Sequence, residues 1–313
     1  MVAIKFELQK LLFALVNTPE KMGSSSPNPR VDAYVAITFV FILFSINWLV
    51  RLFLVVPVAK RILTTRKHKA RKAQVVRFAQ STMEALFYAS FTLLGASIVP
   101  TQTWVWPSSL WWIGHNTGTH HEMRDDLRCY YLMYGARYAQ GFVSVLLEPK
   151  RKDFLEMQLH HVVTVAVVAV SYFYGWNRVG ACVMLLLDPA DVPLHIAKLC
   201  KHVGDTHQST SPKRAKVFFL AADITFVIFA IFFFVTRVAM YPYLCWSAHI
   251  ESSRYFPTRI PETICVMLLE TLLALQVYWF FLIVKSAYNM IVNGHVDDVR
   301  SDDEADDDDE HLD

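Results

Sequence analysis

The stretch "RKDFLEMQLHHVVTVAVVAVSYFYGWNRVGACVMLLLDPADVPLHIAK", residues 151–198, is the part of the sequence that most directly indicates the fold. It contains two apolar runs, one from Leu159 to Trp176 and one that starts at Val179 and continues to Cys200. Each run approaches the roughly 20 apolar residues that a helix needs to cross a bilayer. Histidines open the first run and aspartates interrupt the second. The stretch therefore predicts two consecutive membrane-spanning helices that carry polar groups where such groups are costly.

The composition of the whole chain supports a membrane protein. Hydrophobic residues make up 54% of the 313 residues and the mean hydropathy is +0.30, whereas a soluble domain is about 45–50% apolar. We therefore predict an all-α fold, a polytopic membrane helix bundle with about seven transmembrane helices. The predicted spans are Val31–Val58, Met83–Val99, Cys129–Leu147, Leu159–Trp176, Val179–Cys200, Val217–Tyr241 and Ile264–Tyr288.

Lysine and arginine gather in the loops after the first, third and fifth spans. Cytosolic loops carry the excess of these residues, so the N-terminus is predicted to be lumenal and the C-terminus cytosolic. Residues 1–30 form the predicted lumenal N-terminal segment, which begins with an amphipathic surface helix rather than a cleaved signal peptide. The first transmembrane helix covers residues 31–58. Residues 59–80 form a basic cytosolic linker that is expected to meet anionic lipid headgroups.

The C-terminal segment, residues 291–313, is strongly acidic and contains "DDVRSDDEADDDDE". A block of like charges cannot offset the cost of ordering by burial, so we predict a disordered cytosolic tail. Ser301 precedes Asp302, Asp303 and Glu304, a context that acid-directed kinases favour. We predict phosphorylation there, which would add negative charge; a solvating tail with an unmodified serine is the alternative.

The polar residues of the opening stretch form a candidate catalytic site. His160 and His161 lie near the predicted cytosolic start of one helix, and Asp188, Asp191 and His195 share a stripe of the next if that helix is regular. Carboxylates at this depth usually face a bundle interior, and imidazole suits general-base or nucleophilic work near neutral pH. The predicted catalytic residues are His160, His161, Asp188 and Asp191. In the alternative, an aspartate simply pairs with a buried arginine, Arg137 or Arg237.

The same stretch resembles the Lag1 motif of the ceramide synthases, inside a TLC domain. The matching residues are Arg151, Lys152, Asp153, Phe154, Glu156, Met157, His160, His161, Asn177, Arg178 and Gly180. The departures lie on the next helix, where the family usually has His-Asp-x-Ser-Asp. Leu187 stands at the place of its histidine, Ala190 at the place of its serine, and His195 at the place of a later glutamate. Pro189 and Pro193 are expected to kink that helix.

The resemblance implies an N-acyltransferase of the endoplasmic reticulum membrane. It joins a fatty acyl group from acyl-CoA to the amine of a sphingoid long-chain base and forms ceramide or dihydroceramide. It implies a TLC catalytic domain, residues 81–290, with six helices around a central cavity that runs from His160 toward a lumenal loop. That loop, Tyr241–Pro261, resembles the chain-length determinant of the family. No cofactor and no metal is expected, since acyl-CoA is a co-substrate.

Further binding roles follow from the resemblance. The basic run Lys150, Arg151 and Lys152 is placed to receive the phosphates of coenzyme A, although ordinary positive-inside residues are the alternative. His195 completes the predicted substrate-binding residues. The expected partners are the acyl-CoA, the sphingoid base and the lipid bilayer, with a homo- or heterodimer or a small accessory subunit as further candidates and no nucleic acid.

Two other functions stay open at this level. One is a non-catalytic TLC-domain membrane protein that binds lipid or acts beside the protein translocation channel. The other is a metal-dependent lipid hydroxylase that uses His160, His161, Asp188, Asp191 and His195.

Overall fold

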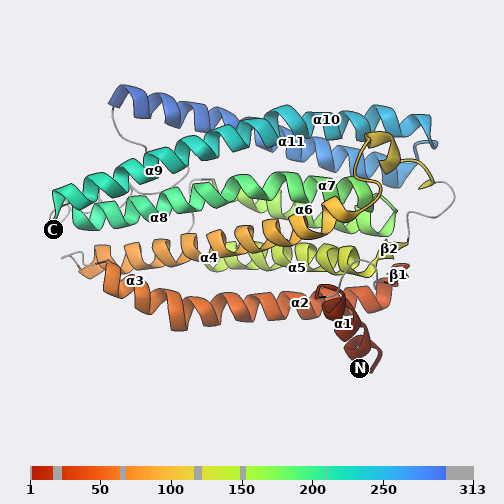
Figure 1. Cartoon of the computed structure of the whole chain (residues 1–313), viewed down its shortest axis with the longest axis horizontal. Helices are drawn as coiled ribbons and strands as arrows, with labels where there is room; N and C mark the ends of the chain where they lie inside the picture. The colour runs from red at the N-terminus through yellow and green to blue at the C-terminus, as the bar shows by residue number, and fades with distance from the viewer. Residues whose placement is uncertain are drawn as a thin grey trace.

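The computed structural model describes residues 2–16, 23–63, 68–115, 122–148, 153–208 and 210–293. Long helices lie side by side along one axis of the molecule (Figure 1). The two short strands and α1 lie at one end, and α3 and the end of α8 lie at the other. The α-helices and strands are α1 (Val2–Ala14), β1 (Ser24–Ser25), α2 (Pro29–Val50), α3 (Val56–Ile62), α4 (His68–Ile98), β2 (Met123–Arg124), α5 (Asp125–Leu147), α6 (Phe154–Phe173), α7 (Asn177–Leu187), α8 (Asp191–His207), α9 (Pro212–Phe233), α10 (Tyr241–Trp246) and α11 (Ile260–Asn293).

Short π-helical and 3-10 segments join several of these helices into longer rods. The π-helical segments are Arg51–Val55, Phe234–Met240 and Ser247–Glu251, and the 3-10 turns are Val99–Thr101, Ser108–Trp111, Asp188–Ala190 and Ser252–Arg254. Within the described residues, six rods are long and apolar enough to cross a membrane, namely Pro29–Ile62, Arg71–Thr101, Phe154–Phe173, Asn177–His207, Pro212–Arg254 and Ile260–Asn289. The predicted all-α membrane bundle is confirmed.

The third predicted span forms α5, which is not among these six apolar rods. It carries Arg128 and Arg137 together with several tyrosines, and almost every residue from Asp125 to Tyr138 is buried. The helix packs against α2 and α6. Its polar side chains face protein partners rather than lipid, so the helix need not be apolar to lie inside the bundle.

Two predicted loops are largely helical. The segment predicted as a lumenal loop, Tyr241–Pro261, continues the preceding rod as far as Arg254. It does so because it packs on its neighbours: the hydroxyl of Tyr241 donates to the carbonyl of Leu269 (2.9 Å), and the indole of Trp112 donates to Ser247 (2.9 Å). Likewise, α4 begins at His68, so much of the basic segment 59–80 belongs to that helix.

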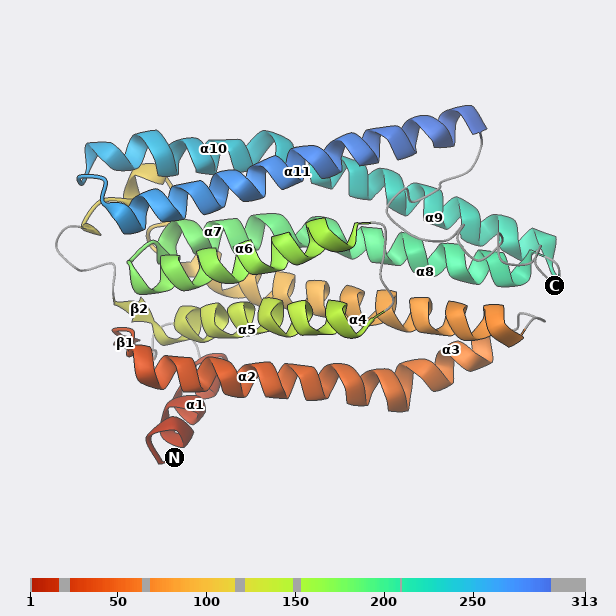
Figure 2. The same ribbon diagram turned by 180° about the vertical axis from the view of Figure 1, so that it is seen from behind.

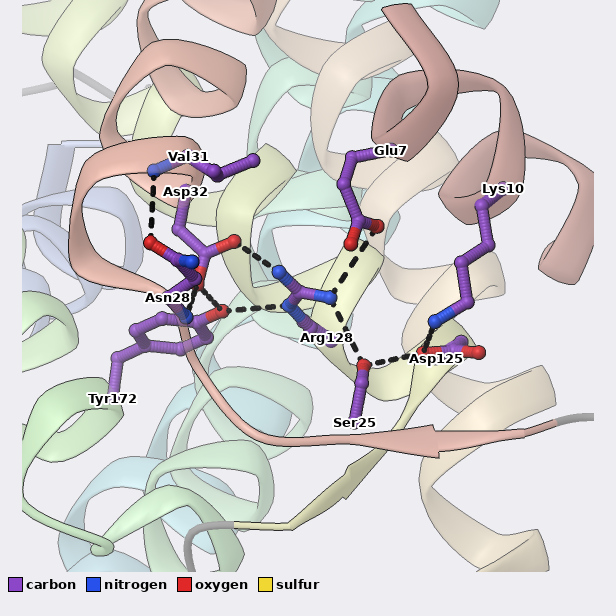
Figure 3. Close-up of polar contacts among 9 residues, drawn as sticks. All are labelled: Glu7, Lys10, Ser25, Asn28, Val31, Asp32, Asp125, Arg128 and Tyr172. Carbon is purple, nitrogen blue, oxygen red and sulfur yellow. Dashed lines mark hydrogen bonds and ion pairs between the residues drawn. The ribbon is translucent and has the colours of Figure 1, made fainter. Parts of the chain in front are cut away.

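A polar network fastens the N-terminal part of the chain to the bundle (Figure 3). The guanidinium of Arg128, only 1% exposed, forms a buried ion pair with Asp32. It also donates to the hydroxyls of Tyr172 (3.2 Å) and Ser25 (2.9 Å) and lies 3.6 Å from Glu7. These contacts join α1, β1, α2, α5 and α6, so one arginine organises this end of the molecule.

The N-terminal helix α1 is held by the same network. Lys10 lies 3.1 Å from Asp125, and Leu11 is fully buried. The outward-facing residues include Phe6 and Phe13, which are largely exposed. A helix forms there, as predicted. It is not simply amphipathic, because Leu11 and the polar residues Glu7 and Lys10 face the bundle while the large apolar residues Phe6 and Phe13 lie outside.

The first span is fastened at its other end as well. Arg51 donates to Glu148 of the α5 terminus at 2.6 Å, and the amide of Gln80 in α4 donates to the same carboxylate. The two clusters therefore fix the rod Pro29–Ile62, which contains α2 and α3, against α4 and α5. Of the predicted acidic tail, residues 291–313, the first three belong to α11. Residues 294–313, which include Ser301, lie outside the described residues.

Replacing Arg128 by Met should destabilise the protein strongly, because it leaves the carboxylate of Asp32 buried and unpaired. Breaking a buried pair costs about 3–5 kcal/mol. Thermal unfolding of the purified full chain in detergent measures the loss. The double variant Arg128→Met, Asp32→Leu should recover part of it, and Tyr34→Phe on the exposed face of α2 is the control. An unchanged transition in Arg128→Met would contradict the organising role of this pair.

Candidate active site

The two adjacent histidines face different pockets. Both lie about two turns into α6. His160 lines an apolar pocket with about 490 Å³ of empty space. His161 lines a more polar pocket of about 610 Å³, together with His195. The pair therefore stands at the junction between two cavities of different character.

The apolar pocket is enclosed by α5, α6, α7 and α11. Along α6 its wall runs from His160 through Thr164 and Val167 to Ser171, a distance of about 16 Å for a regular helix. The pocket thus extends toward the end of the bundle that carries β1, β2 and the turn before α7. This is the direction predicted from the sequence.

The polar pocket is lined by α4, α8, the C-terminal part of α5 and the N-terminal part of α6. At this level α4 and α8 continue beyond the ends of α5 and α6 (Figure 2). Its lining includes Glu84, Glu148 and Asp153. The predicted phosphate-binding residues Lys150, Arg151 and Lys152 lie outside the described residues. In the chain they fall directly between Glu148 and Asp153, both of which line this pocket.

Aromatic rings hold the two imidazoles in place. The ring of Tyr138 lies 5.6 Å from that of His160 and 5.7 Å from that of His161, measured between centroids, and Trp279 contacts His160 at 5.3 Å. A Cβ at Gly141 would lie 2.9 Å from Cε1 of His161, so the imidazole rests directly on the backbone of α5. Among the described residues, Nδ1 of either histidine is buried without a hydrogen-bond partner.

The two candidate aspartates have different partners. Asp188 accepts hydrogen bonds from the hydroxyls of Tyr134 (2.9 Å) and Tyr138 (3.2 Å). Asp191 forms an ion pair with Arg237, so this aspartate pairs with a buried arginine, as in the alternative given for it above. Tyr138 therefore links Asp188 to both imidazoles, since its hydroxyl reaches the carboxylate and its ring packs on the histidines.

A break in the helix separates the aspartates. The rod changes from α7 to a 3-10 turn at Asp188–Ala190, where Pro189 lies, so the predicted interruption is confirmed. The amide of Asp191 bonds to the carbonyl of Asp188, which leaves the carbonyl of Leu187 without its usual helical donor. Arg237 supplies that donor at 2.7 Å. The regular stripe expected for Asp188, Asp191 and His195 is thus replaced by a local turn.

His195 does not occupy the place of the family histidine. Its ring stacks on Tyr88, with centroids 5.7 Å apart, and lines the polar pocket. Leu187 lines the apolar pocket instead. The two side chains therefore face different cavities, although the polar pocket does bring His195 together with His161. In the described ranges, no group of three or more His, Cys, Asp or Glu side chains is arranged to hold a metal ion.

Sequence reasoning missed the tyrosines of α5. Tyr130, Tyr134 and Tyr138 recur every four residues in the sequence and therefore share one face of the helix. That spacing was the available signal, but nothing in it shows that Asp188, some fifty residues later, would lie against the same face.

The TLC domain model matches residues 77–285, about two thirds of the sequence. The chain belongs to the TLC-domain family. The match spans α5, which carries Tyr138, α6, which carries the histidine pair, and the rod that carries the aspartates. The resemblance to ceramide synthases recognised in the sequence is confirmed by the relatives that follow.

Several curated proteins are similar to this TLC-domain chain. Alternaria stem canker resistance protein 1 of Solanum lycopersicum is 28% identical over 301 residues, which covers 90% of this chain and 93% of that protein. Ceramide synthase LOH2 of Arabidopsis thaliana is 27% identical over 76% of this chain and 78% of its own length. Ceramide synthase 5 of Homo sapiens is 31% identical over 79% of this chain, and the match spans 59% of the human protein.

Gly141→Ala should displace the imidazole of His161, because the added methyl group would also lie 3.0 Å from Nη1 of Arg137. We expect a clear loss of whatever reaction the histidine pair supports, with little loss of thermal stability. Val143→Ala, at an exposed position of the same helix, is the matched control. Equal activity of the two variants would mean that the close approach of His161 to α5 has no functional consequence.

Proposed function

We propose that this protein is a sphingoid-base N-acyltransferase, which transfers a fatty acyl group from acyl-CoA to the amine of a long-chain base. The observation that carries the proposal is the position of His160 and His161 between an apolar and a polar pocket. Such a junction suits a thioester, whose acyl chain is apolar and whose coenzyme A part is charged. The ceramide synthases among the relatives support the same reaction class.

The two substrate parts divide between the pockets. The acyl chain extends from His160 along the apolar pocket, where Val167, Met184 and Leu272 offer apolar walls. The coenzyme A part remains at the polar mouth, where Lys150, Arg151 and Lys152 bind its phosphates. Burial of each additional CH₂ of the acyl chain contributes about 0.8 kcal/mol to binding, so the apolar pocket supplies most of the affinity for a long chain.

The chemistry requires one proton acceptor. The amine nitrogen forms a bond to the thioester carbonyl carbon, and the carbon–sulfur bond breaks. An imidazole of the histidine pair accepts the proton that the amine loses and returns it to the departing thiolate, so the products are an amide and free coenzyme A. A route through an acyl-imidazole uses the same pair and the same proton balance.

Asp188 and Asp191 act as positioning residues in this scheme. Asp188 fixes the hydroxyl of Tyr138, whose ring packs against both imidazoles. Asp191 fixes Arg237, which lines the apolar pocket beside Gln276. Either carboxylate also attracts the ammonium group of an arriving long-chain base, before that ammonium group loses a proton to become the reactive amine. His195 lies in the polar pocket, where it contacts the part of the substrate near the thioester sulfur.

The cellular setting belongs to the same proposal. The sphingoid base and the product are membrane lipids, and the chain has helices long and apolar enough to cross a membrane, so the enzyme works within the endoplasmic reticulum membrane. Its N-terminus is lumenal and its C-terminus is cytosolic, following the distribution of lysine and arginine. Assembly as a dimer or with a small accessory subunit is part of the proposal.

The first test is product analysis by mass spectrometry after the purified full chain, in detergent, meets a series of acyl-CoAs and sphinganine. N-acylated base from the wild type, with a fall on the order of 10²-fold or more in His160→Ala or His161→Ala, is expected for loss of acid–base catalysis. Glu270→Gln, outside both pockets, is the control. A wild type that binds lipid but forms no amide would favour a non-catalytic TLC-domain protein.

Acyl-chain preference offers a second test. Leu272 lines the apolar pocket from α11, so Leu272→Trp should shift the product profile toward shorter acyl chains by filling the cavity. Met267→Trp, at an exposed position of the same helix, should leave the profile unchanged. Exchange of residues 241–261 is expected to alter the profile as well. Identical profiles in all of these variants would place the acyl chain elsewhere.

A further inference from the structure

The hydroxyl of Thr164 is an exception among the helical threonines. A threonine inside a helix usually donates its hydroxyl hydrogen to the carbonyl four residues earlier. The described threonines that do so at 2.7–3.1 Å include Thr38, Thr82, Thr206, Thr225, Thr236 and Thr271. Thr164 does not: its Oγ1 is buried and has no partner among the described residues.

Thr164 lies beside His160 in the apolar pocket. It lies four residues after His160 and therefore one turn along the same face of α6. Its side chain is 5% exposed and lines the apolar pocket. The carbonyl that it would ordinarily bond to is that of His160 itself. Thr92 also has an unpartnered hydroxyl, but it does not line this pocket.

Other polar atoms around His160 are unpartnered too. Nδ1 of His160 and Nε1 of Trp279 are buried without a hydrogen-bond partner among the described residues. Buried polar atoms are almost always hydrogen-bonded. Each buried donor or acceptor without a partner costs about 1–3 kcal/mol of folding free energy. Thr164 and His160 both line the apolar pocket, so a molecule bound there can supply the partners that the hydroxyl and Nδ1 lack. Since the hydroxyl of Thr164 can donate, that molecule must present an acceptor.

We propose that the hydroxyl of Thr164 donates a hydrogen bond to the carbonyl oxygen of the acyl group held beside His160. This inference rests on the proposed acyltransferase function. When the nitrogen nucleophile adds to the carbonyl carbon, the oxygen gains negative charge, and the hydroxyl stabilises it without giving up its proton. The charge returns to form the carbonyl again when the carbon–sulfur bond breaks. Thr164 is thereby a catalytic residue in the sense that it touches the reacting oxygen.

The geometry favours a carbonyl oxygen over a group farther along the chain. Only the carboxyl end of a fatty acyl group carries an acceptor, and that end must lie at His160 for reaction. A donor one helical turn away, about 5–6 Å between Cβ atoms, is within reach of an oxygen bound next to the imidazole. Pre-placed donors of this kind strengthen their bond as charge develops, so they lower the barrier more than they tighten substrate binding.

The test compares Thr164→Val, which removes the hydroxyl but keeps the branched shape, with Thr164→Ser, which keeps the hydroxyl. We expect kcat of Thr164→Val to fall on the order of 10²-fold, as for loss of one oxyanion donor, with little change in KM for acyl-CoA. Thr164→Ser should keep most of the activity. Thr225→Val, which loses a hydroxyl that bonds within its own helix, is the control.

A thioether analogue of acyl-CoA separates chemistry from packing, because it has the chain and the sulfur but no carbonyl oxygen. Wild type and Thr164→Val should bind it equally. Weaker binding by the variant, or an equal loss of activity in Thr164→Val and Thr164→Ser, would overturn the inference. If the wild type is active and Thr164→Val is equally active, this inference alone is overturned. If the wild type forms no amide, the proposed function and this inference are both overturned.

Discussion

The ion pair between Arg237 and Asp191 illustrates the constraint on which this bundle depends. In hydrocarbon there is no water to satisfy a charge, so each buried charged group must find its partner inside the protein. Arg128 meets Asp32, Arg137 meets Glu84, and Arg237 meets Asp191. Each pair joins different helices. The helices are therefore placed by polar contacts as much as by apolar packing, because lipid offers apolar surfaces to every helix alike.

Against this background, several buried polar atoms beside His160 are left without a partner in the described part of the chain. The arginines are paired, and Asp188 has two tyrosine donors. Near His160, by contrast, the imidazole Nδ1, the hydroxyl of Thr164 and the indole of Trp279 have no partner among the described residues. Two of these residues, His160 and Thr164, line the apolar pocket. A site with such unpartnered atoms is more easily understood as a binding site than as packing.

Much of the architecture followed from the sequence, because span length and hydrophobicity are local properties of the chain. The seven predicted segments all lie in long helices, and the histidine pair was found from its position at the start of an apolar run. Helix ends were less predictable: the apolar segment around Trp246 continues as helix because it packs on α11. The partners of Asp188 and Asp191 depend on helix contacts across more than forty residues, which no local pattern records.

The turn at Pro189 connects the fold to the candidate chemistry. A regular helix would keep Asp188 and Asp191 on one face, and the backbone amide of Asp191 would donate to the carbonyl of Leu187. The 3-10 turn releases that carbonyl to Arg237, so the guanidinium is held at both Leu187 and Asp191. Asp188 is left to the tyrosines of α5. One local change in helix type thus assigns the two carboxylates to different tasks, one beside the imidazoles and one at the arginine of the apolar pocket.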